Sequence, residues 1–115
     1  MKRIMAVGTG LLAIVTACSK SSSDSTTTVD CGTATKSYST DVSPILQSTC
    51  ATSSSCHASG SSNGPGALTT YQQVYNARVD IRSSVANGSM PKNASLPTSQ
   101  KNIILCWIDN GALNN

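Results

Sequence analysis

The chain has few aromatic and few charged side chains. Its 115 residues include no Phe, three Tyr and one Trp, and only 11% are charged. A chain of this length favours a single domain. With so few large apolar side chains it can bury only a thin core, and small domains of this kind usually need a disulfide, a metal or a cofactor for stability.

Other absences exclude classes of function. No cluster of Lys or Arg lies outside the N-terminus, so nothing in the sequence indicates nucleic-acid binding. His57 is the only histidine, and no pairing of acid, base and nucleophile around it suggests a hydrolase. We therefore expect a protein that is not an enzyme.

The N-terminus has the pattern of an export signal. A basic "MKR" precedes "IMAVGTGLLAIVTA", an apolar run that is too short and too interrupted by glycine for a comfortable membrane span. The run ends in "VTAC", residues 15–18, which resembles the lipobox of bacterial lipoproteins. The resemblance implies a signal peptide over 1–17, with cleavage before a lipidated Cys18. The alternative is an ordinary secretory signal cut nearby.

An export signal changes the expected charge, location and extent of the mature chain. The formal charge of +3 falls to +1 when Lys2 and Arg3 leave with the signal (3 − 2 = 1). By the common bacterial sorting rule, Ser19 after the lipidated cysteine implies an outer-membrane lipoprotein that faces the periplasm or the cell surface. Residues 18–30 then form a polar, flexible tether, because they lack the apolar residues needed to fold. The folded domain is expected over 31–115.

The folded part is predicted to be all-α, with three to four helices. The first helix is expected to start with Ser43 as N-cap and Pro44 at its first position, and to end before Cys50. The strongest pattern covers residues 70–88, with a capping box of Thr70 and Gln73.

This second stretch has a possible break near Asn76 and is closed by Gly88. A last helix is expected to be capped by Thr98 or Ser99 and closed by Gly111. Ile104 and Trp107 would lie on its core face. No stretch of any length shows a strand pattern, and there is no internal repeat.

Four cysteines remain after Cys18, and free thiols are uncommon in the oxidising exported compartment. Two divisions are open. One is a cofactor-linked pair, Cys50 and Cys56, with a disulfide between Cys31 and Cys106. The other is two disulfides, for which the sequence allows three pairings.

The segment "CATSSSCH", residues 50–57, ends in a Cys followed directly by His. Covalent haem sites of c-type cytochromes have the pattern C-x-x-C-H, so the gap here is three residues longer. The order of "YSTDVSPILQSTC", "CH", "GSMPK" and "CWIDNGALNN" resembles class I cytochrome c, and more narrowly the small haem c domains of Bacteroidetes-type lipoproteins. The resemblance covers about residues 38–115.

This resemblance implies roles for particular residues. Cys50 and Cys56 would form thioethers to haem c. His57 and Met90 would be the axial iron ligands. Three further roles are implied for the remaining site residues: a Pro65 carbonyl that accepts the ring N–H of His57, a Leu68 side chain against the haem face, and a Cys31–Cys106 disulfide, which the chain-entropy model values at about 4 kcal/mol.

The resemblance implies electron transfer by a membrane-anchored monohaem cytochrome, with redox proteins as partners. Weak peroxidase-like activity would follow if Met90 did not bind the iron. The departure is the Cys50–Cys56 gap, which leaves the first thioether open. The alternative function is a non-catalytic exported domain with two disulfides, used for binding or scaffolding. Zinc held by Cys50, Cys56 and His57 is a weaker alternative.

Overall fold

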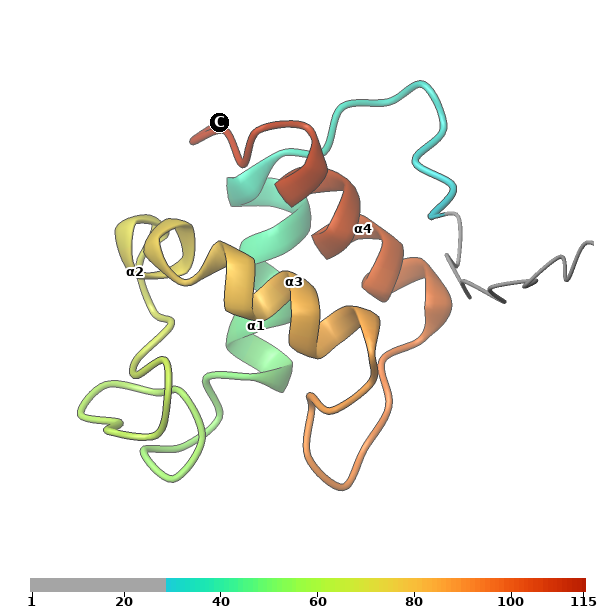
Figure 1. The fold of residues 1–115 in the computed structure, drawn as a ribbon. Coiled ribbons are helices and arrows are strands. Elements are labelled where there is room, and N and C mark those ends of the chain that lie inside the picture. Colours follow the sequence, from blue (N-terminus) through green and yellow to red (C-terminus); the bar gives the residue numbers. More distant parts are fainter. Residues whose placement is uncertain (1–28) are drawn as a thin grey trace, which may run out of the picture.

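The computed structural model describes residues 29–115 and consists of helices joined by long loops (Figure 1). The predicted all-α class is confirmed, because no strand occurs in this part of the chain. The order of elements is η1 (Tyr38–Val42), α1 (Ser43–Thr49), α2 (Tyr71–Asn76), α3 (Arg78–Ala86) and α4 (Thr98–Asp109). The predicted signal peptide, the predicted lipidation site Cys18 and most of the predicted tether lie outside the described residues.

The first helix starts earlier than the sequence predicted. A π-helical turn, η1, runs directly into α1, and its N-cap is Ser37, whose side chain accepts a hydrogen bond from the Thr40 backbone N–H. The carboxylate of Asp41 in turn accepts from the Ser37 N–H at 2.8 Å. Ser43 is therefore not an N-cap. Pro44 has no N–H to donate inside a helix. The π turn directly before it is closed by an i→i+5 bond from the Ser43 N–H to the Tyr38 carbonyl.

The second helical stretch follows the prediction. The Thr70 and Gln73 side chains form a complete capping box, and the helix is interrupted at Ala77, between α2 and α3. Gly88 has a positive φ of 78° just after α3, as a closing glycine requires. The prediction for α4 was wrong at its start, since the helix begins at Thr98 without a side-chain cap.

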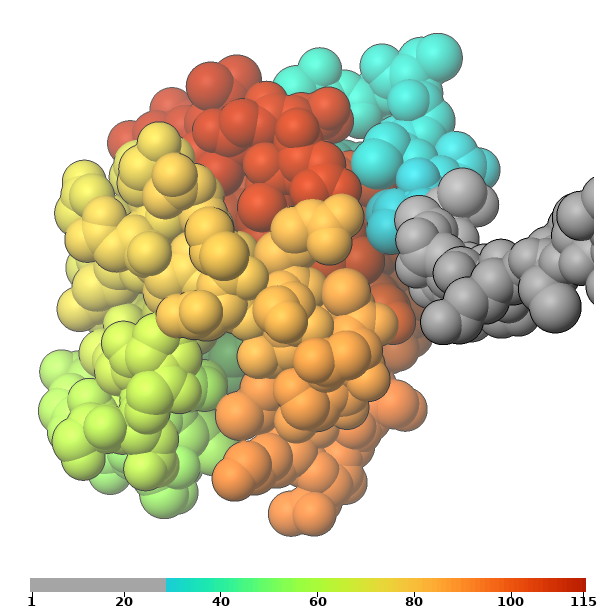
Figure 2. Space-filling model, viewed as in Figure 1, coloured from blue at the N-terminus to red at the C-terminus, as the bar shows by residue number. Residues whose placement is uncertain are grey.

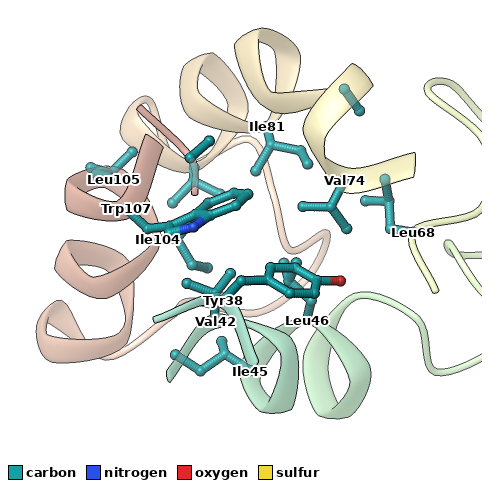
Figure 3. Packing of buried hydrophobic residues seen from close by; sticks show 13 residues of the cluster. Tyr38, Val42, Ile45, Leu46, Leu68, Val74, Ile81, Ile104, Leu105 and Trp107 are labelled. Atoms are coloured by element: carbon teal, nitrogen blue, oxygen red, sulfur yellow. The ribbon is translucent and has the colours of Figure 1, made fainter. Parts of the chain in front are cut away.

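The hydrophobic core gathers where η1, α1, α3 and α4 meet (Figure 3). All four aromatic rings of the chain lie in one cluster around Tyr38, whose ring centroid is 5.1 Å from that of Tyr71 and 5.5 Å from that of Trp107. Trp107 is 1% exposed, and its indole N–H donates to the Leu113 carbonyl at 2.9 Å. The few aromatics are thus concentrated in one place, where their area counts most.

A disulfide joins Cys31 to Cys106, which confirms the predicted pair. It ties the segment before η1 to the buried face of α4, across a sequence separation of 75 residues. Val29, which the sequence placed in the tether, packs against the core, so the ordered domain includes it. No helix of the described residues is long and apolar enough to cross a membrane.

Candidate functional site

The long loop between the two free cysteines folds back on the end of α1. Cys50 ends α1, and its carbonyl accepts a hydrogen bond from the His57 backbone N–H at 3.0 Å. The residues between them bulge outward and are mostly exposed. A turn in which the Cys56 N–H donates to the Ser53 carbonyl closes the bulge. The five-residue gap therefore still delivers Cys56 and His57 to the end of α1.

His57 is buried, at 8% exposure, and its ring is fixed by one hydrogen bond. Its Nδ1 lies 2.8 Å from the carbonyl oxygen of Gly66. A carbonyl only accepts, so Nδ1 carries a proton, and in the neutral ring Nε2 is the nitrogen with the lone pair. Nε2 has no hydrogen-bond partner among the described residues, yet it is not sealed off from solvent.

The resemblance implied that the Pro65 carbonyl accepts the ring N–H of His57. This was wrong, because the acceptor is the carbonyl of the next residue, Gly66. Gly66 has a φ of 94°, a conformation that few other residues adopt. Its N–H is bonded to the Asn63 carbonyl, which fixes the turn that presents the Gly66 carbonyl to the ring. The segment "NGPGAL" has one residue more than the family pattern, and this extra residue could have signalled the shift.

Asn63 is a site residue that the sequence did not single out. Its side-chain amide donates to the Ser55 carbonyl at 2.6 Å. Ser55 directly precedes Cys56, so this bond fastens the glycine-rich loop to the loop that carries the thiol. Such a contact between two irregular loops leaves no periodic pattern in the sequence.

A cavity of about 820 Å³ opens beside His57. Its volume falls in the upper part of the range of about 300–1,000 Å³ that is usual for ligand and cofactor sites. The cavity brings together all the residues predicted for a cofactor: Cys50, Cys56, His57, Pro65, Leu68 and Met90. Apolar side chains from two helices complete its wall: Leu46 from α1, and Ile81 and Val85 from α3, with Pro91 from the following loop.

Met90 comes to this cavity from a different loop, residues 87–97. Figure 1 shows that loop and the loop of residues 50–70 on different sides of the lower ends of α1 and α3. The Met90 N–H donates to the Ser84 carbonyl at 3.2 Å, which holds the residue beside the end of α3. Leu68 is 3% exposed and is held next to His57, because its N–H donates to the His57 carbonyl at 2.8 Å.

The donor set of this cavity fits covalent haem. Two thiols, an imidazole and a thioether belong to residues that line this one cavity, and these are the groups that a c-type haem requires. The zinc alternative fits less well, because no group of three or more His, Cys, Asp or Glu side chains is placed to hold a metal between residues 29 and 115.

The two thiols of the site differ in environment. Cys50 and Cys56 are both free thiols. Of the two disulfides in the alternative interpretation, the structure therefore contains only one, Cys31–Cys106. Burial raises the pKa of the Cys50 thiol, and the nearby Cys56 adds to the rise. Hydrogen bonds from Ser53, Thr52 and Ser55 lower the pKa of the exposed Cys56 thiol.

This difference predicts unequal reactivity in the protein without cofactor. A thiol with a lowered pKa is deprotonated at lower pH, and the thiolate is the reactive form. We expect iodoacetamide at neutral pH to alkylate Cys56 at least about tenfold faster than Cys50, and the ratio of the two rates to fall as the pH rises above both pKa values. Timed quenching followed by peptide mass spectrometry measures both rates.

The Ser53→Ala variant is the matched control. It removes the first hydrogen bond that stabilises the Cys56 thiolate and leaves Cys50 unchanged. It should slow alkylation of Cys56 alone. Equal rates for the two cysteines in the unchanged protein would contradict the assignment.

Comparison of the chain with protein-family models, with curated proteins and with solved structures gives no significant match. The residues and the geometry of this cavity are therefore the basis for assigning a function to the chain.

Proposed function

We propose that the chain is a monohaem c-type cytochrome that transfers electrons, anchored to the outer membrane by lipid on Cys18. The observation that carries the proposal is the shared cavity. Residues from two loops and two helices line this cavity, and they include Cys50, Cys56, His57 and Met90, although Cys50 and Met90 are 40 positions apart (90 − 50 = 40).

Each side chain then has a distinct task. Cys50 and Cys56 hold the group covalently through thioethers. His57 binds the iron through Nε2, and the Gly66 carbonyl keeps the ring oriented and makes the imidazole a better donor. Met90 binds from the second loop. When bound, haem c supplies an iron that gains and loses a single electron, and Met ligation favours its reduced form.

The rest of the wall keeps the site dry. Leu46, Leu68 and Val85 are at most 4% exposed and face the same cavity. Apolar walls exclude water and favour the less charged, reduced state of the iron. His57 and Met90 together would hold the iron without leaving it a site for a substrate, which would suit electron transfer.

Production of the domain in a host that matures c-type haem tests the proposal. We expect a Soret band and a mass increased by one haem, with the adduct on the peptide that contains residues 50–57. The pyridine haemochrome spectrum then distinguishes two thioethers from one and so reports on Cys50. A colourless protein whose mass shows the loss of four hydrogens would instead support the alternative, an exported domain with two disulfides.

The Met90→Ala variant tests the second ligand. We expect it to keep the covalent haem and to change from a low-spin to a high-spin spectrum, because the sixth position of the iron opens. Weak peroxidase-like activity should appear with it. The control is Ser89→Ala, a neighbouring exposed position whose hydroxyl bonds the Ser84 carbonyl. It should stay low-spin; a Met90→Ala spectrum equal to that of the unchanged protein removes Met90 from the ligand set.

A further inference from the structure

A long part of the chain carries no formal charge. Residues 42–77 contain no Asp, Glu, Lys or Arg. This uncharged segment forms α1, both loops around His57, and α2. In Figure 2 it forms the green and yellow side of the molecule. The charged side chains of the described residues all lie before or after it: Asp30, Lys36, Asp41, Arg78, Asp80, Arg82, Lys92, Lys101 and Asp109.

The rim of the cavity shares this character. On the side of the uncharged segment it is lined by hydroxyl and amide side chains: Ser48, Thr49, Thr52, Ser55 and Asn63. On the other side it has one Asp80 and one Lys92, whose charges are opposite. Arg82 adds nothing to the field there, because its guanidinium is bonded to both carboxylate oxygens of Asp109, at 2.6 and 2.9 Å.

The uncharged segment also carries the exposed member of the thiol pair. Cys56 is exposed, whereas Cys50 is half-buried and His57 is buried. A group attached at Cys56 would have its nearest protein edge at this segment. Electron transfer needs close approach of the partner to such an edge, so the residues around Cys56 are where that partner must sit.

We propose that the exposed surface of residues 48–66 is the docking site for a redox protein whose own contact surface is uncharged and hydrogen-bonding. The inference rests on the proposed function. Proteins steered by opposite charges gain a factor of about 10–1,000 in association rate, and salt removes that gain. The side chains of residues 48–66 supply no charge with which to steer, so the association rate is set mainly by diffusion and fit and depends little on salt.

Small oxidants of opposite charge test the surface without knowledge of the partner. The reduced holoprotein is mixed in a stopped-flow instrument with trianionic hexacyanoferrate(III) or with tricationic tris(phenanthroline)cobalt(III). Each oxidant takes one electron, leaving the ferric protein and the reduced complex. Between about 0.01 M and about 1 M ionic strength, where the Debye length falls from about 30 Å to about 3 Å, both rates should change by less than about threefold.

Lysine variants show which surface of the protein the electron leaves through. Ser54→Lys with Ser59→Lys adds two charges to exposed positions of the uncharged segment. At low salt this variant should speed the anionic oxidant and slow the cationic one, each by about threefold or more. Thr33→Lys with Thr35→Lys adds the same charge to the exposed segment before η1, which Figure 1 shows in cyan on the opposite side from the loop of residues 50–70. This pair should change both oxidation rates less than the Ser54 and Ser59 pair does.

A second readout does not use electron transfer. Nitroxide probes of opposite charge are added to the reduced protein, and the line broadening of each backbone amide is compared between them. Amides of residues 48–66 should be broadened equally by both probes, because no local potential attracts either one.

The outcomes separate the two proposals. A protein without a haem spectrum overturns the proposed function. A haem-bearing protein overturns the docking proposal alone if its rates diverge more than tenfold with salt, if the two lysine pairs act alike, or if the two nitroxides differ over residues 48–66.

Discussion

We expect His57→Ala to abolish the low-spin spectrum of the haem-bearing protein completely. His57 is the only imidazole of the chain, and no other described nitrogen ligand lines the cavity except Lys92. Added imidazole should restore the low-spin spectrum, since removal of the ring leaves space that is continuous with the cavity. Optical titration with imidazole measures this recovery.

The fold itself should survive the substitution. The His57 backbone N–H bonds the Cys50 carbonyl, and its carbonyl accepts from the Leu68 N–H; alanine keeps both bonds. Far-ultraviolet circular dichroism should therefore match that of the unchanged protein. The variant loses only the side-chain bond to Gly66. An unchanged low-spin spectrum in His57→Ala would place the ligand elsewhere and overturn the assignment.

The second large effect concerns the disulfide. Cys31→Ala should lower the free energy of unfolding by about 4 kcal/mol, because the bond closes a loop of about 75 residues and restricts the unfolded chain. Small domains are stable by only about 5–15 kcal/mol, so the loss is a large share of the total. Urea denaturation followed by the fluorescence of Trp107, the single tryptophan, measures it.

The choice of Cys31 avoids a second effect. Cys106 is fully buried, and removing its sulfur would also leave a cavity, whereas the Cys106 thiol left behind by Cys31→Ala behaves as a small apolar group. A reducing agent is the matched control, since it should destabilise the unchanged protein and leave Cys31→Ala as it was. Equal unfolding free energies for the two proteins in the absence of reductant would show that the bond contributes nothing.

Much of the local structure could be predicted from the sequence because its causes are local. The capping box of Thr70 and Gln73 needs only four consecutive residues, and the structure has both of its bonds. The glycine after α3 likewise acts through its own φ. The start of the first helical stretch was predicted wrongly, because it depends on the Ser37–Asp41 contact and on a π turn, which no periodic pattern marks.

The candidate site divides in the same way. The sequence by itself supplied the residue types and their order: two thiols, one imidazole and one methionine, and a stretch without formal charge. Only the tertiary structure decided that Gly66 holds His57, that Asn63 fastens the two loops, and that Cys50 and Cys56 differ in burial. These features depend on which loop packs against which, and packing is set by contacts between residues far apart in the chain, beyond the reach of any local pattern.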